Sequence, residues 1–440
     1  MKKLKILFYS LFYITVLTGC GKEQKQLSEE QAESIIFQPQ MDASENITLH
    51  IVGYMESFDA LDLIAEDFQK YYPNCKIQYN YLEDYQNSLE KRIIEQENID
   101  IFTVYPQYFQ KSAIIADNAE NLYEANINLS NIETVVLKNC FYNKNLKEIP
   151  LALNTCILVV NNSLLEKEGL FVPTNQGQFI NVCEQLVEQG YIPIQGNATP
   201  VYFSMMRSEY VVRLGKSENA SSIFAALNQG MEGSSEYLRE NFELLTNFID
   251  RGYIDPILID SYEDNYKQAA LRFFEGNVPF LVTNLDTFSS MKKWERDSTT
   301  FSNARFEYNF AYLPFGEKNI CAYVDAWTGF SVYENSANKE WANEFLRFFM
   351  TVEELNRFAN AKGMPTISID NKENKRFRDL FEQREENIVY HGEIAISEEL
   401  NQVYKSTIKQ LGKGKLTVKK ALERVERELG KKQDKHMDIN

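Results

Sequence analysis

The sequence ITLHIVGYMESFDALDLIAEDFQKYYPNCKIQYNY, residues 47–81, decides the fold class. Apolar and polar residues alternate over 47–52, and they alternate again over 77–81. Between these runs Leu61, Ile64 and Phe68 recur at steps of three and four. A period of two predicts a strand and a period of 3.6 predicts a helix. The stretch therefore predicts a strand, a helix that ends before Pro73, and a second strand.

The same pattern continues to residue 105. Leu89 and Ile93 indicate another helix, and DIFTVY at 100–105 is a short buried strand. This alternation predicts a parallel sheet with helices on its faces. Ligands of such sheets bind beyond the carboxyl ends of the strands. The residues that we expect at this edge are Tyr54, Glu56, Thr103 and Tyr105.

The amino terminus has the pattern of an export signal. Three lysines in the first five residues precede an uncharged stretch at 6–16, which is too short to span a bilayer. LTGC at 17–20 then resembles the bacterial lipobox, in which the cysteine carries the lipid. We expect residues 1–19 to be a lipoprotein signal peptide and Cys20 to be the lipidated residue that anchors the chain to the membrane.

Composition restricts the class of partner. The chain of 440 residues has a net charge of -17, and its first nineteen residues hold three lysines and no acid, so the remainder has a net charge of -20. Nucleic-acid binding requires a concentration of Lys and Arg, so nucleic acid is not an expected partner. Residues 20–45 are mostly polar and predict a flexible tether.

Cysteine and histidine usage argues against a metal site or a cofactor. Five cysteines follow Cys20, an odd number with no CxxC pair, and the chain has three histidines and no HExxH. We expect most of these cysteines to be small buried apolar residues. No metal, cofactor or catalytic residue is predicted.

The last third of the chain is rich in helical patterns. Trp341, Phe345 and Phe348 share a helical face, and the helical spacing continues until Gly363. Near the end, Thr417 is placed to cap a helix that we expect to close at Gly430.

Short segments along the chain resemble the type-1 extracellular solute-binding proteins of ABC importers, a family that mostly captures sugars. The resemblance covers roughly residues 46–430. Leu151 stands where the family commonly has Tyr, and residues 284–286 replace its Gly-x-Trp. The similar segments are DFQKYYPNCKI at 67–77, NIDIF at 98–102, EIPLALNT at 148–155, VVNNSLL at 159–165, FEGNVPFLV at 274–282, YLP at 312–314, AWTGF at 326–330 and KEWANEFL at 339–346.

The resemblance implies an α/β, periplasmic-binding-protein-like type II fold, with two α/β lobes joined by a multi-crossing hinge and a ligand cleft between them. The implied crossings lie near 150–154, 283–284 and 325–329. Lobe one would hold 46–152 plus 284–325, and lobe two would hold 153–283 plus 326–440.

Recognition of a polyhydroxylated ligand requires aromatic faces for the sugar C–H surfaces, and carboxylates and amides for its hydroxyls. Trp327 is our first candidate, because the family's matching segment commonly places an aromatic ring over the ligand. Glu56 and Asp325 come next. The remaining candidates are Tyr54, Tyr105, Asn154, Tyr202, Asn284, Asp286 and Trp294.

The resemblance implies a monomeric lipoprotein on the extracellular face of the cell membrane that captures an oligosaccharide for ABC permease subunits. No GxSxG, P-loop or GxGxxG motif indicates an enzyme. The alternatives on the same fold are a peptide or polyamine binder and a receptor that feeds a sensor kinase. A surface glycosidase with paired carboxylates is a further alternative. A cleft with excess carboxylates and few aromatic residues would favour a cationic ligand.

Overall fold

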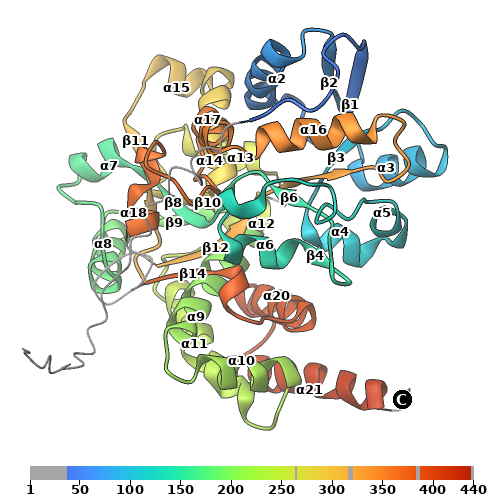
Figure 1. Ribbon diagram of the computed structural model, residues 1–440. Helices are drawn as coiled ribbons and strands as arrows, with labels where there is room; N and C mark the ends of the chain where they lie inside the picture. The colour runs from blue at the N-terminus through green and yellow to red at the C-terminus, as the bar shows by residue number, and fades with distance from the viewer. Residues whose placement is uncertain (1–36, 263–264, 316–320, 383–386, 438–440) are drawn as a thin grey trace, which may run out of the picture. The chain divides into compact units, whose positions relative to one another are not determined.

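The computed structural model describes residues 37–262, 265–315, 321–382 and 387–437. The expected signal peptide, Cys20 and the first part of the expected tether lie outside these residues. The strands and helices of the described part are drawn in Figure 1.

The first sheet contains the strands that the opening sequence predicts. It has the order β2-β1-β3-β13-β6, with β1 parallel to both β2 and β3. Strand β13 lies antiparallel between β3 and β6. The strands are β1 (Ile47–Gly53), β2 (Cys75–Tyr81), β3 (Ile101–Val104), β6 (Ile149–Pro150) and β13 (Gly329–Val332).

The second sheet has the order β11-β8-β10-β9. Every residue of β8 is buried, and alternate side chains enter two hydrophobic clusters, with Ile157 in one and Leu158 in the other. Both faces of this sheet are therefore covered, as is usual for α/β proteins. The strands are β8 (Cys156–Asn161), β9 (Ile194–Gly196), β10 (Phe280–Asn284) and β11 (Tyr308–Tyr312).

A third sheet, with the order β14-β12-β7, connects the other two along the chain. Strand β7 (Leu153–Asn154) lies between β6 and β8 in sequence, and β12 (Ala322–Ala326) lies between β11 and β13. These two connections pair with each other, Asn154 opposite Asp325. Strand β14 (Ile388–Tyr390) is parallel to β12.

The strand pairing corrects part of the expected lobe division. The division placed 284–325 in lobe one, yet β11 pairs with β8 of the second sheet. It placed 326–440 in lobe two, yet β13 is an interior strand of the first sheet. The alternation of a strand predicts its buried face and does not identify its partner strand, so the chain pattern could not reveal this exchange.

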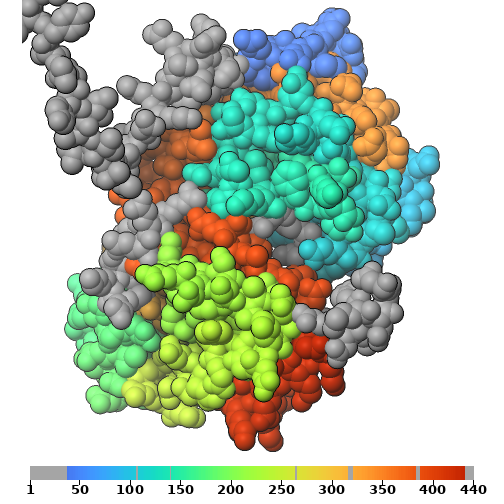
Figure 2. Space-filling model, turned by 60° about the horizontal axis from the view of Figure 1, so that its bottom comes forward, coloured from blue at the N-terminus to red at the C-terminus, as the bar shows by residue number. Residues whose placement is uncertain are grey.

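Helices cover the sheets and follow the predicted periodicity. The expected continuous helical run after Trp341 is two helices, because Thr351 has an extended backbone and caps the second one. The last helix runs past Gly430, where we expected its end. Figure 2 shows the yellow-green segment of α9 to α11 beside the red helices α20 and α21, and these helices are in contact.

The remaining elements are the hairpin β4 (Phe141–Tyr142) and β5 (Asn145–Leu146), with α2 (Asp59–Tyr71), α3 (Tyr85–Ile94), α4 (Pro106–Lys111), α5 (Ala113–Asp117), α6 (Thr134–Leu137), α7 (Asn162–Lys167), α8 (Gln176–Glu188), α9 (Met205–Gly215), α10 (Ala220–Gln229), α11 (Arg239–Asp250), α12 (Pro256–Ser261), α13 (Tyr266–Phe273), α14 (Leu285–Trp294), α15 (Thr299–Asn303), α16 (Lys339–Phe349), α17 (Val352–Lys362), α18 (Arg378–Glu382), α20 (Glu398–Gly412) and α21 (Val418–Met437). Short 3-10 turns are η1 (Leu129–Asn131), η2 (Lys138–Cys140), η4 (Ser234–Leu238), η5 (Glu295–Asp297), η6 (Lys375–Phe377) and η7 (His391–Glu393), and η3 (Thr199–Ser204) is a π-helical turn.

The folded body begins earlier than the expected end of the tether at residue 45. The Phe37 ring is buried and lies edge-on to Phe348, with 5.1 Å between ring centroids. The backbone N–H of Gln40 donates to the Tyr72 hydroxyl at 2.9 Å and to the Glu344 carboxylate at 2.8 Å. Phe37 ends a short apolar run, Ile35 to Phe37, that has no helical or strand periodicity, so the sequence did not reveal this contact.

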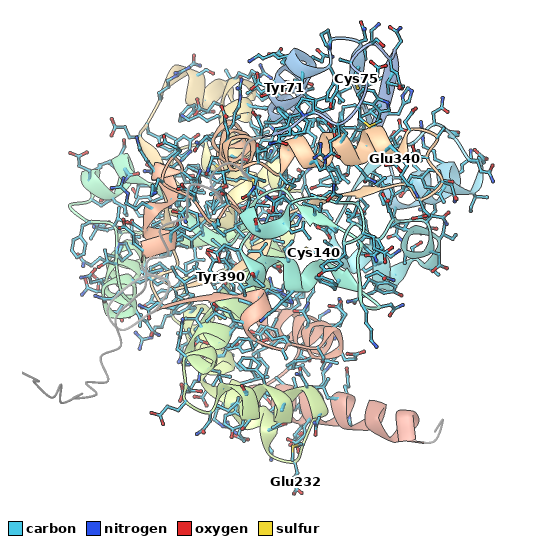
Figure 3. The ribbon with its side chains drawn as sticks, viewed as in Figure 1. Tyr71, Cys75, Cys140, Glu232, Glu340 and Tyr390 are labelled. Carbon is cyan, nitrogen blue, oxygen red and sulfur yellow. The ribbon has the colours of Figure 1, made fainter. Side chains whose placement is uncertain are left out.

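The cysteines of the described residues are free and buried, which confirms the expectation for this group. Figure 3 labels two of them, Cys75 on β2 and Cys140 near the end of η2. None of the helices in the described ranges is long and apolar enough to cross a membrane. The same residues contain no cluster of His, Cys, Asp or Glu suited to a metal ion.

Candidate ligand cleft

A cleft of about 880 Å³ collects the ends of strands from all three sheets. Nine of the ten residues that the sequence predicted for ligand binding line it. They are Tyr54, Glu56, Tyr105, Asn154, Asn284, Asp286, Trp294, Asp325 and Trp327.

Tyr54 and Tyr105 form one wall of the cleft. They follow the parallel strands β1 and β3, whose carboxyl ends meet at the same sheet edge. The Tyr105 hydroxyl donates to the Tyr54 hydroxyl at 2.6 Å, and the ring centroids are 5.1 Å apart. Burial, reinforced by the neighbouring Tyr105, raises the pKa of Tyr54 well above its ordinary value. Burial and the charge of Asp286 also raise the pKa of Tyr105. Both phenols are therefore neutral groups that can donate and accept hydrogen bonds.

Asn154 and Asp286 form a polar pair beside these rings. Asn154 ends β7, and Asp286 lies in the first turn of α14, directly after β10. The Asn154 amide donates to the Asp286 carboxylate at 3.1 Å. The pair fixes one carboxylate oxygen and leaves the other available to a hydroxyl group, since an ionised carboxylate accepts several hydrogen bonds.

Asp325 and Tyr323 project from β12 on the same face, because they are two residues apart in a strand. The His391 ring lies 5.7 Å from the Tyr323 ring in a stacked arrangement, and its Nδ1 is 3.2 Å from Asp325 Oδ2. Burial opposes ionisation of Asp325, but His391 and Arg207 outweigh it and hold the pKa of Asp325 below its ordinary value. Asp325 is therefore an ionised carboxylate in the cleft wall.

Trp327 lines the cleft but is only 3% exposed. The Lys362 ammonium lies 5.0 Å from its ring centroid, and Phe58 meets the ring edge-on at 6.4 Å. Its indole Nε1 is buried with no acceptor among the described residues. Trp327 thus offers a ligand much less ring surface than the half-buried Tyr54, Tyr105 and Trp294.

Thr103, expected at the strand ends, is fully buried within β3 and does not line the described cleft, and neither does the candidate Tyr202. The Tyr202 side chain is fully buried in the second hydrophobic cluster, against the backbone of Gly412. A Cβ atom built at Gly412 would lie 2.6 Å from the Tyr202 ring, so α20 packs directly on this residue. Tyr202 follows a Pro in a π-helical turn, and its neighbours in sequence gave no indication of which side faces the cleft.

The cleft also contains residues that the sequence reasoning missed. Tyr323 could have been found from Asp325 by the period of two. Arg207 and Lys362 had no comparable signal, because each is a basic residue on an amphipathic helix. The cleft-lining residues that the sequence did not predict include Ser204, Arg207, Ser208, Tyr266, Lys267, Lys293, Arg296, Asp297, Tyr323 and Lys362.

Two sheets with covered faces, joined by paired connections beside a cleft of aromatic, amide and carboxylate groups, define a binding protein of the α/β class. Residues 53–354 match the family of bacterial extracellular solute-binding proteins, and the chain belongs to this family. The fold is therefore the expected periplasmic-binding-protein-like α/β fold.

A curated relative matches most of this chain, and solved structures share its fold. The multiple sugar-binding protein of Streptococcus mutans is 18% identical over 374 residues, which are 82% of this chain and 81% of that protein. The GacH receptor of Streptomyces glaucescens, solved unliganded and with acarbose, has a TM-score of 0.66 and 14% identity over 88% of this chain and 99% of its own. The cyclic alpha-maltosyl-1,6-maltose binding protein of Arthrobacter globiformis has a TM-score of 0.63 and 14% identity over 88% of this chain and 98% of its own.

Proposed function

We propose that the protein captures an oligosaccharide outside the cell and delivers it to the permease subunits of an ABC importer. The observation that carries the proposal is the composition of the cleft. Its described lining includes the aromatic residues Tyr54, Tyr105, Tyr266, Trp294, Tyr323 and Trp327, together with amide, hydroxyl and carboxylate groups. Aromatic faces with fixed polar groups are what recognition of a sugar requires.

The charges of the lining argue against the cationic-ligand alternative. The described lining holds five cations, Arg207, Lys267, Lys293, Arg296 and Lys362, and four carboxylates, Glu56, Asp286, Asp297 and Asp325. A polyamine site would show an excess of carboxylates with few aromatic residues, and this cleft has neither property. The sugar-binding relatives support the same choice.

The proposed function also requires that the two lobes move relative to each other and that the protein is held at the membrane. The two large sheets would form the cores of two lobes that close on the ligand, with β7 and β12 as the connections that bend. The protein would act as a monomer without catalysis, held at the extracellular face of the membrane by lipid on Cys20. Cell fractionation tests the anchor: Cys20→Ser should move the protein from the membrane fraction to the medium.

The binding experiment is calorimetry of the purified protein against neutral and acidic oligosaccharides, peptides and polyamines. We expect at least one oligosaccharide to bind and the other classes to give no heat. Trp294→Ala should weaken that binding roughly tenfold, since it removes an aromatic surface worth about 1.5 kcal/mol. Tyr237→Ala removes an exposed aromatic residue outside the cleft and should leave the affinity unchanged. Binding of a peptide or polyamine with no response to any sugar would refute the proposal.

A further inference from the structure

The cleft carries a different charge balance from the rest of the chain. The chain has a net charge of -17, yet the described lining of the cleft has one more cation than carboxylates. Charged walls around a cleft attract ligands of the opposite sign. A ligand anion would bind best to a cation that is not already paired with a carboxylate of the protein.

Two of the five cations are neutralised by the protein itself. Lys267 Nζ lies 2.6 Å from the Asp297 carboxylate, and Lys293 Nζ lies 2.8 Å from Asp59. Arg296 is exposed at the rim, where water screens it. Arg207 and Lys362 differ from these three. Their charges act on Asp325 and Asp286 respectively, but neither cation forms an ion pair with a carboxylate of the described residues.

Arg207 is held rigidly in the wall of the cleft. Its guanidinium carbon lies 4.7 Å from the centre of the Phe203 ring and 4.8 Å from that of Tyr323, so it is stacked between two aromatic rings. Ser204, the last residue of η3, and Ser208 of α9 lie three residues before and one residue after Arg207 and line the same cleft. This stacking fixes the plane of the guanidinium before a ligand arrives, and preorganisation of this kind favours affinity.

The hydrogen-bonding capacity of Arg207 is largely unused. One nitrogen donates to the Asn401 side chain at 3.4 Å, and the buried Nε has no acceptor among the described residues. A guanidinium has five N–H donors. The cleft carboxylates Asp325 and Asp286 each contact another partner, His391 and Asn154 respectively, although one oxygen of Asp286 stays available. Arg207 is thus a cation with free donors beside a ligand site.

We propose that the ligand is an oligosaccharide bearing an anionic group, either a sugar carboxylate or a sulfate ester, and that Arg207 recognises this group. The inference rests on the proposed function and specifies its substrate class. Both anionic groups present oxygens that a guanidinium binds through paired N–H donors. Lys362, which contacts the Trp327 ring, adds a second positive charge to the site.

The first test compares matched ligands on the purified protein by calorimetry. Each uronate oligosaccharide is paired with its neutral counterpart of the same linkage, for example α-1,4-digalacturonate with α-1,4-galactobiose, and sulfated disaccharides form a third set. We expect an anionic member to bind at least roughly tenfold more tightly than its neutral counterpart, and this preference to shrink as salt is raised. The uronate and sulfate sets distinguish the two sources of the anion.

The second test asks whether Arg207 causes the preference. Arg207→Met should weaken binding of the anionic member roughly 30-fold and that of a neutral sugar less than about threefold. Arg207→Lys keeps the charge and the aromatic contacts but loses the paired donors, and it should give an intermediate loss. Arg251→Met, which removes an exposed guanidinium outside the described cleft lining that is paired with Glu184, is the control and should leave the preference intact.

Three results would overturn the inference. If the neutral oligosaccharides bind more tightly than the anionic ones, the inference is wrong but the proposed function is still supported. An anionic preference that survives in both folded Arg207 variants overturns the inference as well. If no sugar of any set binds, the proposed function fails and the inference fails with it. Thermal unfolding of each variant shows whether it is folded. If Arg207→Met does not fold, Arg207→Lys alone tests the inference.

Discussion

Glu354 is a buried acid whose ionisation opposes folding. It is 5% exposed, and burial, together with the charge of Asp67, raises its pKa to about 7. The carboxyl of Glu354 holds its proton more tightly in the folded protein than in the unfolded chain, where its pKa is near 4.5. The resulting stabilisation is fully present below pH 4.5 and is lost as the pH rises through about 7. Glu354→Gln removes the titration. The variant should be more stable than the natural protein by up to about 3 kcal/mol at pH 8, with no such gain at pH 4.5.

Urea unfolding at pH 4.5, 6 and 8 measures this difference. Asn360→Ala, an exposed and uncharged change on the same helix, provides the control, since it removes no ionisable group and should change stability equally at each pH. A stability difference for Glu354→Gln that does not vary between pH 4.5 and 8 would contradict the expectation.

Individual site residues were predictable where they follow strands or the resembling segments. Tyr54, Tyr105, Asn154, Asn284 and Asp325 all lie in, or directly after, strands of the described sheets, and all line the cleft. Arg207 and Lys362 lie on helices, where the sequence shows a polar residue but not what it faces. Trp327 lines the cleft, but its burial beneath Lys362 depends on contacts between distant segments.

At the scale of elements, β13 and β6 lie so close together at Gly329 that no side chain fits at this position. Gly329 of β13 faces Glu148, and a Cβ atom at position 329 would overlap the Glu148 side chain and lie 2.6 Å from the Ile149 carbonyl oxygen. Glu148 is fully buried, neither of its carboxyl oxygens has a partner among the described residues, and burial raises its pKa well above the ordinary value. Glu148 is therefore a neutral acid that fills the space beside a glycine.

Gly329→Ala should therefore destabilise the protein by about 1 to 3 kcal/mol, because the added methyl group overpacks this contact. Gly177→Ala is the matched control. Gly177 lies in α8, where the nearest atom to an added Cβ is 3.6 Å away, so the change should be neutral or stabilising. Urea unfolding of the two variants measures the difference, and equal stability would show that the strands separate without cost.

The elements themselves were largely predictable and their pairing was not. The expected strand at 47–52 is β1, and the expected helix through Leu61 to Phe68 is α2. Local periodicity determines such elements because it determines which face is buried. The position of β13 between β3 and β6, and of β11 beside β8, depends on segments more than a hundred residues apart. No local pattern contains that information.

At the scale of the whole molecule, charge is divided between surface and cleft. The chain is strongly acidic, which the sequence already showed, whereas the described cleft lining has more cations than carboxylates. Net charge therefore argued against nucleic acid as a partner but did not indicate the charge of the cleft. An acidic surface with a cationic cleft would direct an anionic ligand to one place on the molecule.

The boundary of the folded body follows from the contacts of residues 37–45. Phe37 packs on Phe348 and beneath the Arg347 guanidinium, and Glu45 accepts a hydrogen bond from the Trp341 indole at 3.2 Å. A chain that begins at residue 46 loses this buried ring and leaves the hydroxyl of Tyr72 without its backbone donors. It should be less stable than a chain that begins at residue 37 by roughly 3 kcal/mol, close to the cost of truncating a buried Phe.

Urea unfolding of the 37–440 and 46–440 chains measures this loss, and Phe37→Ala in the longer chain isolates the part due to the ring. Both chains should bind the same oligosaccharide with equal affinity, because none of residues 37–45 lines the described cleft. Equal unfolding midpoints would show that residues 37–45 belong to the tether. A lower midpoint for 46–440 alone would mean that residues 37–45 are fastened to α2 and α16 and belong to the folded body, so that the expected tether would be shorter than the sequence suggests.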